Sequence, residues 1–456
     1  MTGAEVGILS VILILVLIYC GLYVPVALGL VSFVCVWIVK GNLDVPVNLL
    51  AVATGDTVAH YIFGVIPLFV LMGLLVSNAG LGRDIYEVAN WMFRSIRGGL
   101  GIATVAANAV FAAITGTTIA SASVFTRISL PEMQRFGYES RFAVGVIAGS
   151  SVLGMLIPPS VMLILYAVIT EQSIGDMFLA GVLPGIVLSI AYGVLIIAMA
   201  YLTPGFVGHR AVSREARIEA GRMTLWEAIV KMAAPVGLIG LVMGGIYGAF
   251  EGLLWGRVNL KFTPTEAGAV GAFFALLIAL AKRTLSWQSF WKILVETGHI
   301  TASILFLIIA ASMYSRMLGV TGIPSELGEW LKGLDMGFVG IIAIYVVLLL
   351  AMGTILDTVS IILIVVPLFL PVLIPAEGAL FPSDMVWFGI VTVIGAEIGL
   401  LTPPLGIACF VIKSTLEDKS ITLYDIFAGA FPFAVTMLLV LILIIAVPWF
   451  SLAFVG

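Results

Sequence analysis

The chain has 456 residues, of which 62% are hydrophobic and 10% are charged. Soluble domains are about 45–50% apolar and about 25% charged, so this chain could not cover its apolar surface in water. The mean hydropathy of +1.22 agrees. The formal net charge of −4, without any basic run, excludes a nucleic-acid-binding protein. The composition therefore predicts a multi-pass membrane protein of the all-α class, embedded in the lipid bilayer.

The amino-terminal part predicts a scaffold of outer helices. Its first apolar run is too long for one ordinary span and carries Gly21 and Pro25 near its middle, so two shorter helices fit better. The next segment places Asp56 and His60 amid apolar residues, which predicts an interfacial helix. The expected scaffold, residues 1–96, has helices at 6–20 and 24–39, the interfacial helix at 46–63, a span at 65–81 and an amphipathic segment at 83–96.

Two interrupted apolar stretches come next. Residues 99–131 contain a small polar break, and neither side reaches the roughly 20 residues that a span needs. A hairpin that dips into the membrane and returns therefore fits better than two spans. Residues 142–170 are interrupted by Pro158 and Pro159, which predicts a broken helix. We group both stretches as a transport part at 97–176, followed by a clean span at 177–203.

The most polar stretch, 204–231, predicts a cytoplasmic loop because it is rich in Arg and Lys. Beyond it the order of elements repeats, with a hairpin at 338–373 and a broken span at 385–412 that contains Pro403 and Pro404. The remaining expected elements are spans at 232–250 and 264–281 joined by an insert at 251–261, an amphipathic segment at 285–297, a span at 298–316, a second amphipathic segment at 324–333 and a last span at 424–453. They form a second scaffold at 232–333, a second transport part at 334–413 and the final span.

The two halves of the chain, 1–203 and 232–456, can be laid over one another. Three pairs of segments match in order with nearly constant separation: Gly116-Thr117 with Gly353-Thr354, Pro158-Pro159 with Pro403-Pro404, and Ala180-Gly181 with Ala428-Gly429. With 204–231 inside, the span before this loop and its counterpart at 424–453 run in opposite directions. The halves are therefore predicted to be inverted repeats, the arrangement of secondary transporters, with both chain termini on the outer side of the membrane.

The polar breaks predict ion sites. Unpaired backbone groups in hydrocarbon cost several kcal/mol each, so a break persists where it lines a site. Freed carbonyls and hydroxyls suit a sodium ion, and half-helix N-termini suit an anion. We expect one sodium site from Gly116, Thr117, Ser121, Ser150, Ser151 and Gly154, and a second from Gly353, Thr354, Asp357, Thr358, Gly395, Gly399 and Thr402. The substrate is expected between the hairpin tips, near Ser121, Ser123 and Thr358.

Each of these residues also has a plain structural interpretation. A hydroxyl in a membrane helix can bond the carbonyl one turn back, and a Pro-Pro pair can simply kink a helix. Asp357 could ligate sodium, carry a proton or only pair with a hydroxyl. Glu397, the other acid in apolar surroundings, falls opposite Val152 in the first half, which makes the two sites chemically unequal.

Enzymatic chemistry is not expected from this sequence. The three histidines fall at interfaces or loops, and there is no nucleotide-binding GxxxxGK[ST] pattern. We therefore predict no catalytic residue, no metal other than sodium and no ATP hydrolysis by this chain.

Several stretches resemble the large membrane subunit of tripartite ATP-independent periplasmic (TRAP) transporters. They are GLYVPVALGL (21–30), IPLFVLMGLLVSNAGL (66–81), GSSVLGMLIPPS (149–160), FLAGVLPG (178–185), FTPTEAGAVGAF (262–273) and GLLTPPLG (399–406). The resemblance implies an elevator-type importer in the bacterial inner membrane, driven by two or more sodium ions. It implies a small organic anion as substrate, such as a carboxylate, a dicarboxylate or a sugar acid of the sialic acid type. It also implies two partners, a periplasmic substrate-binding protein and a small four-helix membrane subunit.

Some questions stay open at this point. We expect the small subunit to be a separate chain, and the insert at 251–261 to be either a partner contact or an innocuous loop. The alternative function is a single-component sodium–carboxylate symporter of similar architecture. A membrane-embedded enzyme or assembly factor would require clustered His, Asp, Glu or Cys ligands, which the sequence lacks. The identity of the substrate is not encoded in any feature of this chain.

Overall fold

The computed structural model describes residues 3–208, 223–249, 261–333, 336–373, 385–404 and 406–455, and these residues form a helical protein without strands. Six helices in these ranges are long and apolar enough to cross a membrane, and a bent pair of helices would make a seventh span. Half of the predicted loop at 204–231 and nearly all of the insert at 251–261 lie outside the described residues. Their predicted roles therefore stay predictions.

The outer helices of the first half form in the predicted order, although the predicted interfacial helix at 46–63 ends at Ala59 and a separate 3-10 helix follows it. The first apolar run divides into two helices, and Gly21 between them has a φ of 93°, a left-handed conformation that glycine adopts without strain. The elements are α1 (Gly3–Tyr19), α2 (Val24–Lys40), α3 (Asp44–Ala59), the short 3-10 helix η1 (Tyr61–Gly64), α4 (Val65–Asn78) and α5 (Leu81–Phe93).

The central helices of the first half contain both predicted interruptions. The hairpin is built from α6 (Gly99–Thr115) and α7 (Thr118–Arg135). The broken helix consists of α8 (Ser140–Ser151), α9 (Leu153–Leu156) and α10 (Val161–Ile169), and it bends by 42° at the break. The predicted clean span is the 29-residue helix α11 (Ile174–Leu202), which is followed by the short α12 (Pro204–Val207).

The second half repeats this order. Its outer helices are α14 (Leu225–Ile246), α15 (Pro264–Ala281), α16 (Trp287–Thr321) and α17 (Ile323–Gly333). Its hairpin is α18 (Gly337–Gly353) with α19 (Thr358–Leu373), and its broken span is α20 (Met385–Gly399) with α21 (Ile407–Thr415). The last helices are α22 (Leu423–Ala446) and α23 (Trp449–Leu452).

Three predicted boundaries were wrong. Helix α14 begins at Leu225 instead of 232, because Thr224 and Glu227 form a capping box that starts a helix inside the predicted loop. The predicted segments 285–297 and 298–316 are one continuous 35-residue helix, α16, whose interior Gly298 keeps its backbone N–H and so does not end it. The last span ends at Ala446, just before Pro448.

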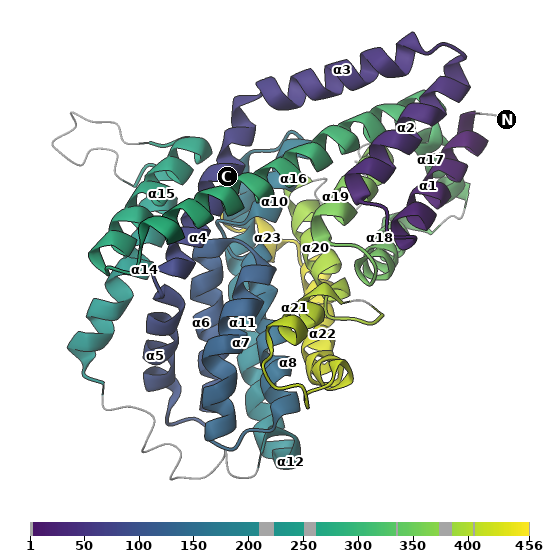
Figure 1. The fold of residues 1–456 in the computed structure, drawn as a ribbon. Coiled ribbons are helices and arrows are strands. Elements are labelled where there is room, and N and C mark those ends of the chain that lie inside the picture. The colour runs from purple at the N-terminus through teal and green to yellow at the C-terminus, as the bar shows by residue number, and fades with distance from the viewer. Residues whose placement is uncertain are drawn as a thin grey trace.

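Packing between the halves confirms the two-repeat architecture. Helix α4 packs against α15, and the corresponding pair from the other half, α16 and α2, packs in the same way. Likewise α6 packs on α8 as α18 packs on α20. Both chain ends lie in the upper half of Figure 1, while α12 lies at the lower end. The halves thus interlock, and the elements around the two breaks meet in the middle of the molecule.

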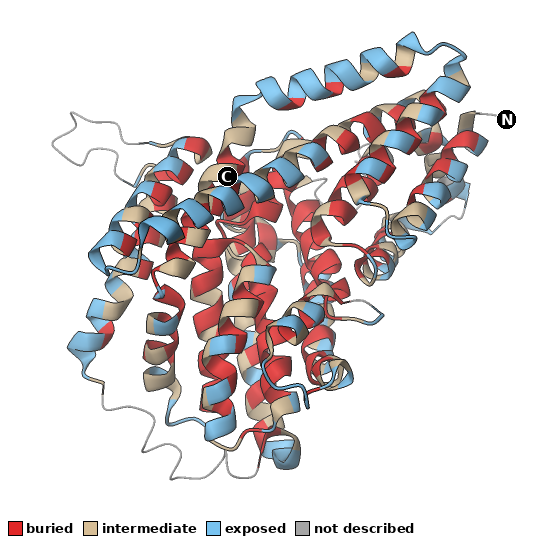
Figure 2. Cartoon of the chain, viewed as in Figure 1, coloured by how far each residue is buried: buried red, intermediate tan, exposed pale blue. Residues whose placement is uncertain are grey.

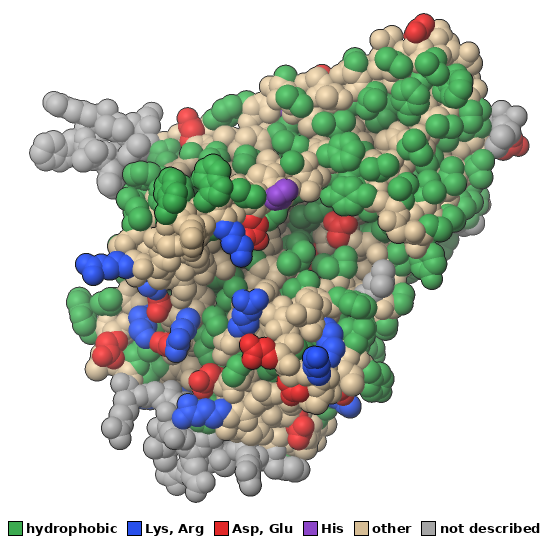
Figure 3. Space-filling view, viewed as in Figure 1, with side chains coloured by type: hydrophobic (Ala, Val, Ile, Leu, Met, Phe, Trp, Pro, Cys, Tyr) green, Lys and Arg blue, Asp and Glu red, His purple; other side chains and the backbone are tan. Residues whose placement is uncertain are grey.

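Burial separates a central group of helices from an outer group. Every residue of α8 from Phe142 to Ser151 is buried, and so is every residue of α20 from Val386 to Gly399. In contrast, α3 and the outer sides of α2 and α16 are largely exposed (Figure 2). Hydrophobic side chains cover the upper right of the surface, and charged side chains gather over its lower part (Figure 3). This segregation is typical of a protein with an apolar belt and a polar aqueous end.

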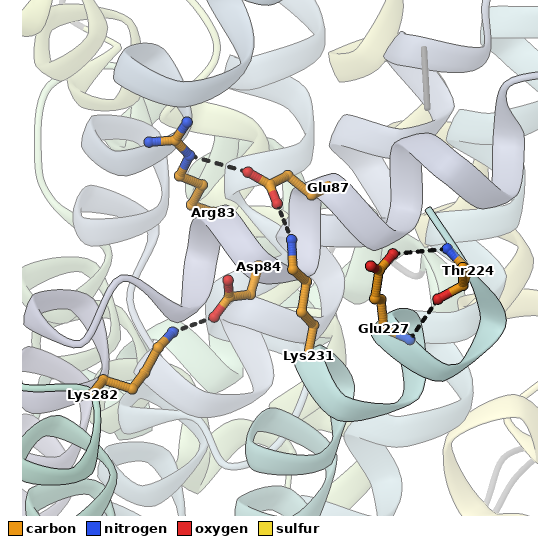
Figure 4. Close-up of polar contacts among 7 residues, drawn as sticks. All are labelled: Arg83, Asp84, Glu87, Thr224, Glu227, Lys231 and Lys282. Atoms are coloured by element: carbon orange, nitrogen blue, oxygen red, sulfur yellow. Dashed lines mark hydrogen bonds and ion pairs between the residues drawn. The ribbon is translucent and has the colours of Figure 1, made fainter. Parts of the chain in front are cut away.

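Ion pairs fix α5 to the second half of the chain (Figure 4). Glu87 accepts hydrogen bonds from Arg83, at 3.1 Å, and from Lys231 of α14, while Asp84 pairs with Lys282 just after α15. Burial by itself would raise the pKa of Glu87, but the hydrogen bonds and charges of Lys231 and Arg83 outweigh it and hold the pKa below 4.5. Glu87 is therefore ionised at neutral pH, and α5 is anchored.

Candidate ion site at the hairpin tips

The first hairpin turns at Gly116 and Thr117. Gly116 ends α6 with a φ of 64°, and its N–H bonds the carbonyl of Ala112, while Thr117 is extended and α7 begins at Thr118. A Cβ on Gly116 would lie 2.9 Å from the carbonyl oxygen of Pro159. The position therefore needs glycine both for its backbone conformation and for its contact with the broken helix.

The broken helix of the first half encloses this tip. A Cβ on Gly154 would lie 2.9 Å from the carbonyl oxygen of Thr117, so the two backbones touch. Ser160 caps α10 by accepting from the N–H groups of Met162 and Leu163 at 3.2 and 3.4 Å, and it donates to the Met155 carbonyl at 2.5 Å. The break predicted from Pro158 and Pro159 is thus a hydrogen-bonded turn that lies against the hairpin tip.

The second hairpin has the same relation to its own broken span. A Cβ on Gly399 would lie 2.3 Å from the Cα of Gly353, and Gly395, one turn earlier, lies against Leu349. Helices α18 and α20 therefore approach closely through glycine. The structure brings the predicted tip residues together with the predicted break residues in both halves.

Asp357 caps the helix that follows the second tip. Its carboxylate accepts the Ser360 N–H at 3.2 Å and also the Ser360 hydroxyl, so it occupies the N-cap position of α19. Of the three roles considered for Asp357, pairing with a hydroxyl is therefore present. A role as a sodium ligand stays a prediction.

Most predicted hydroxyl ligands bond a carbonyl of their own helix. Ser150 donates to Val146 at 2.7 Å, Ser151 to Ala148 at 2.8 Å, Thr354 to Ala351 at 2.8 Å, and Thr402 to Gly399 at 2.9 Å. This is the plain structural role that such residues have in membrane helices. This bond uses only the hydroxyl proton, so the oxygen lone pairs of Ser151, Thr354 and Thr402 remain available to accept a bond or ligate a cation, while Ser150 also accepts a hydrogen bond from Asn108.

Several buried side-chain oxygen atoms of the first half lack a hydrogen-bond partner among the described residues, and those of Asn108 and Ser121 lie on the two helices of the hairpin. Asn108 in α6 donates its amide to Ser150 at 2.5 Å, but its Oδ1 accepts no hydrogen bond. The Oγ of Ser121 in α7 is likewise buried without a partner. An unsatisfied buried acceptor costs about 1–3 kcal/mol, so such atoms suggest a ligand. Sequence analysis missed Asn108, although a lone amide in an apolar helix was a usable signal. Ser123, which was predicted beside Ser121 near the substrate, is half-buried.

Glu397 joins the two hairpins. It is fully buried on α20, and its carboxylate accepts the Thr118 hydroxyl at 2.9 Å and the Thr358 hydroxyl at 2.7 Å. Thr118 and Thr358 are the first residues of α7 and α19. In the sequence, the match of Gly116 with Gly353 implies that Ser121, and not Thr118, corresponds to Thr358. The register differs because the second tip, 354–357, is longer than the first, 116–117.

Fold and site together define a membrane transporter of two inverted helical repeats. A solved structure titled as the Alcanivorax borkumensis YdaH transporter superposes with a TM-score of 0.66 over 90% of both chains, at 12% identity. A structure of Neisseria gonorrhoeae MtrF superposes with a TM-score of 0.57 at 14% identity. These similarities establish the fold alone.

Sequence similarity identifies the family of the chain. Residues 11–450 match the family described as tripartite ATP-independent periplasmic transporter, DctM component, and the chain belongs to it. It is 32% identical to the C4-dicarboxylate TRAP transporter large permease protein DctM of Pseudomonas aeruginosa, over 89% of both chains. It is 29% identical to the sialic acid TRAP transporter large permease protein SiaM of Vibrio cholerae, over 94% of both.

The resemblance found in the sequence is thereby confirmed. The chain is a large permease subunit, and the relatives it matches are named as permeases and not as enzymes. It is also 28% identical to the isethionate TRAP transporter permease protein DctMQ of Oleidesulfovibrio alaskensis, of which it covers 64%.

Proposed function

We propose that this subunit forms the path for sodium-coupled import of a small organic anion. The substrate class is a carboxylate, a dicarboxylate or a sugar acid, as the names of the dicarboxylate and sialic acid relatives suggest. The observation that carries the proposal is the pair of hairpin tips, each held against a glycine-rich break, with orphaned buried oxygens at Asn108 and Ser121. Buried oxygens at a break in a membrane helix suit a sodium ion.

In this proposal each tip holds one sodium ion. Backbone carbonyls at Gly116 and Thr117, with the free oxygens of Asn108 and Ser121, supply the first set of ligands. Carbonyls around Gly353, with the carboxylate of Asp357, supply the second. Helices α7 and α19 both begin at the tips, and the positive ends of their dipoles favour an anion there. A substrate carboxylate would accept hydrogen bonds from hydroxyls such as Ser123 and would sit between the two ions.

Movement follows the division between central and outer helices. The buried group, α6–α10 and α18–α21, would move as a unit that carries the tips. The outer helices α1, α2, α4, α14 and α15 would form the scaffold, with α3, α5, the start of α16 and α17 as connecting arms. The ion pairs of α5 with Lys231 and Lys282 on the scaffold side, together with its packing on α6, support its assignment as a connecting arm. This is an elevator mechanism in an inner-membrane protein whose termini face the periplasm.

Two partners complete the system. A periplasmic binding protein would deliver the anion, and a small four-helix membrane subunit, as a separate chain, would pack on the scaffold.

Reconstitution tests the proposal by omission of components. The chain is placed in proteoliposomes with both partners, with either partner alone and without partners, and uptake of a labelled carboxylate is measured with and without sodium outside. We expect uptake only with sodium and the complete set. Sodium-dependent uptake by this chain alone would instead establish the single-component symporter, and uptake independent of sodium would remove the sodium coupling.

A further inference from the structure

Beyond the two ion sites themselves, the buried carboxylate of Glu397 links them. We infer that Glu397 is a positioning residue that couples the two ion sites, because it holds both hairpin tips in one arrangement. Sodium binding at one tip then favours sodium binding at the other. This inference rests on the proposed function and extends it to the cooperativity of the coupling ion.

The geometry gives one carboxylate oxygen to each tip. Oε2 of Glu397 accepts the Thr118 hydroxyl at 2.9 Å, and Oε1 accepts the Thr358 hydroxyl at 2.7 Å. Both threonines are buried, and each directly follows the tip residues of its hairpin, Thr117 and Asp357. Because the two oxygens belong to one planar group, a shift of either tip is felt at the other.

The helix that carries Glu397 is held firmly enough to transmit such a shift. It is buried along its length, and its glycines at 395 and 399 lie against Leu349 and Gly353 of α18. It also packs on α9, α10 and α22. The carboxylate therefore has little freedom to follow one tip and release the other.

The coupling is expected to be positive, because binding of the first sodium ion orders both hairpin tips. The first sodium ion must order its own tip and, through Glu397, the second tip as well. The second ion meets a tip that is already ordered, so it binds with less loss of conformational entropy. With two linked sites, the Hill coefficient for sodium is expected to approach about 2, the number of sites.

The test measures the Hill coefficient for sodium in uptake by the complete reconstituted system. Glu397→Met keeps the length of the side chain but removes both acceptors, so the coefficient should fall from about 2 to about 1. Glu397→Gln can accept from one threonine and donate to the other, so it should restore most of the cooperativity. Thr118→Val breaks one link and should resemble Glu397→Met. The matched control is Thr126→Val, whose hydroxyl bonds only the Ala122 carbonyl of its own helix, at 2.6 Å.

The outcomes separate the two proposals. A wild-type chain whose uptake needs sodium but shows a Hill coefficient of about 1 contradicts the coupling and leaves the proposed function intact. Wild-type cooperativity in Glu397→Met also contradicts the coupling. A Glu397→Gln variant whose Hill coefficient is as low as that of Glu397→Met contradicts it as well, because that result would assign the effect to the charge of Glu397 instead of its hydrogen bonds. If Glu397→Met does not fold, the Hill coefficient of Thr118→Val provides the test of the coupling. A wild type indifferent to sodium contradicts the proposed function itself.

Discussion

The two hairpin tips share a backbone plan and differ in chemistry. In the first half the tip is Gly116–Thr117, without an acid, and the unpaired oxygens on its two helices are the neutral ones of Asn108 and Ser121. In the second half the tip is longer and ends in Asp357, which caps α19. The repeat therefore preserves the close glycine contacts, while only the second tip carries an acid of its own.

The outer helices show a second difference between the halves. In the first half, α3, η1 and α4 form three pieces, whereas the second half has the single helix α16. Pro67 near the start of α4 cannot donate to the carbonyl one turn back, so a helix could not run through smoothly. The arm of the second half has no such proline and stays continuous. The first arm therefore has a joint where the second does not.

The largest effect is expected where backbones touch. Gly399→Ala would place a Cβ 2.3 Å from the Cα of Gly353, and Gly154→Ala would place one 2.9 Å from the carbonyl oxygen of Thr117. Overpacking of this kind costs about 1–3 kcal/mol or more. We expect both variants to lose uptake and thermal stability, with Gly399→Ala the more severe. Gly193→Ala in α11, where the added Cβ meets nothing within 4 Å, is the control. Near-normal uptake by Gly399→Ala would show that the tips do not need this contact.

Removal of the charge at the second tip should act on sodium before it acts on folding. Asn can replace Asp357 as an N-cap with little loss of stability. If the carboxylate also serves the ion, Asp357→Asn should raise the sodium concentration for half-maximal uptake about tenfold, which corresponds to about 1.4 kcal/mol. Sodium titrations of uptake measure this directly. An unchanged sodium dependence would remove Asp357 from the ligand set.

At the first tip, removal of one hydroxyl is expected to weaken sodium binding without lowering thermal stability. Ser121→Ala deletes a buried hydroxyl oxygen that has no partner. If that oxygen ligates sodium, the variant should need several-fold more sodium, with unchanged or slightly higher thermal stability in sodium-free buffer. Ser129→Ala on the same helix, whose hydroxyl bonds the Phe125 carbonyl at 2.8 Å, is the matched control. Equal sodium dependence of the two variants would argue for a purely structural Ser121.

The smallest effect is expected at the anchor of α5. Glu87→Gln weakens the ion pairs with Arg83 and Lys231, which are partly exposed and therefore contribute about 1 kcal/mol or less. The pKa of Glu87 is lower in the folded protein, so its contribution is full at pH 7 and is lost as the pH falls below 4.5. The difference in melting temperature between wild type and variant should therefore shrink in acid. A difference that persists at low pH would mean that another contact is responsible.

Sequence analysis predicted the two repeats, the hairpins and the broken helices because each depends on local chemistry. Clusters of glycine, proline and small polar residues weaken an apolar helix locally, so the breaks at Gly116, Pro158, Gly353 and Pro403 were visible. The contact between Glu397 and Thr118 was not, because it joins residues far apart in the chain through a register that only the three-dimensional tips define. The continuity of α16 was missed because a helix can pass from an amphipathic to an apolar stretch without ending.

One measurement tests the central claim most directly. Proteoliposomes that contain this subunit, its small membrane partner and a loaded binding protein are given an inward sodium gradient, and the labelled anion inside is followed over time. The account predicts accumulation above the outside concentration without ATP, and its collapse when a sodium ionophore dissipates the gradient. Equal uptake with a potassium gradient of the same size, or accumulation that survives the ionophore, would contradict it.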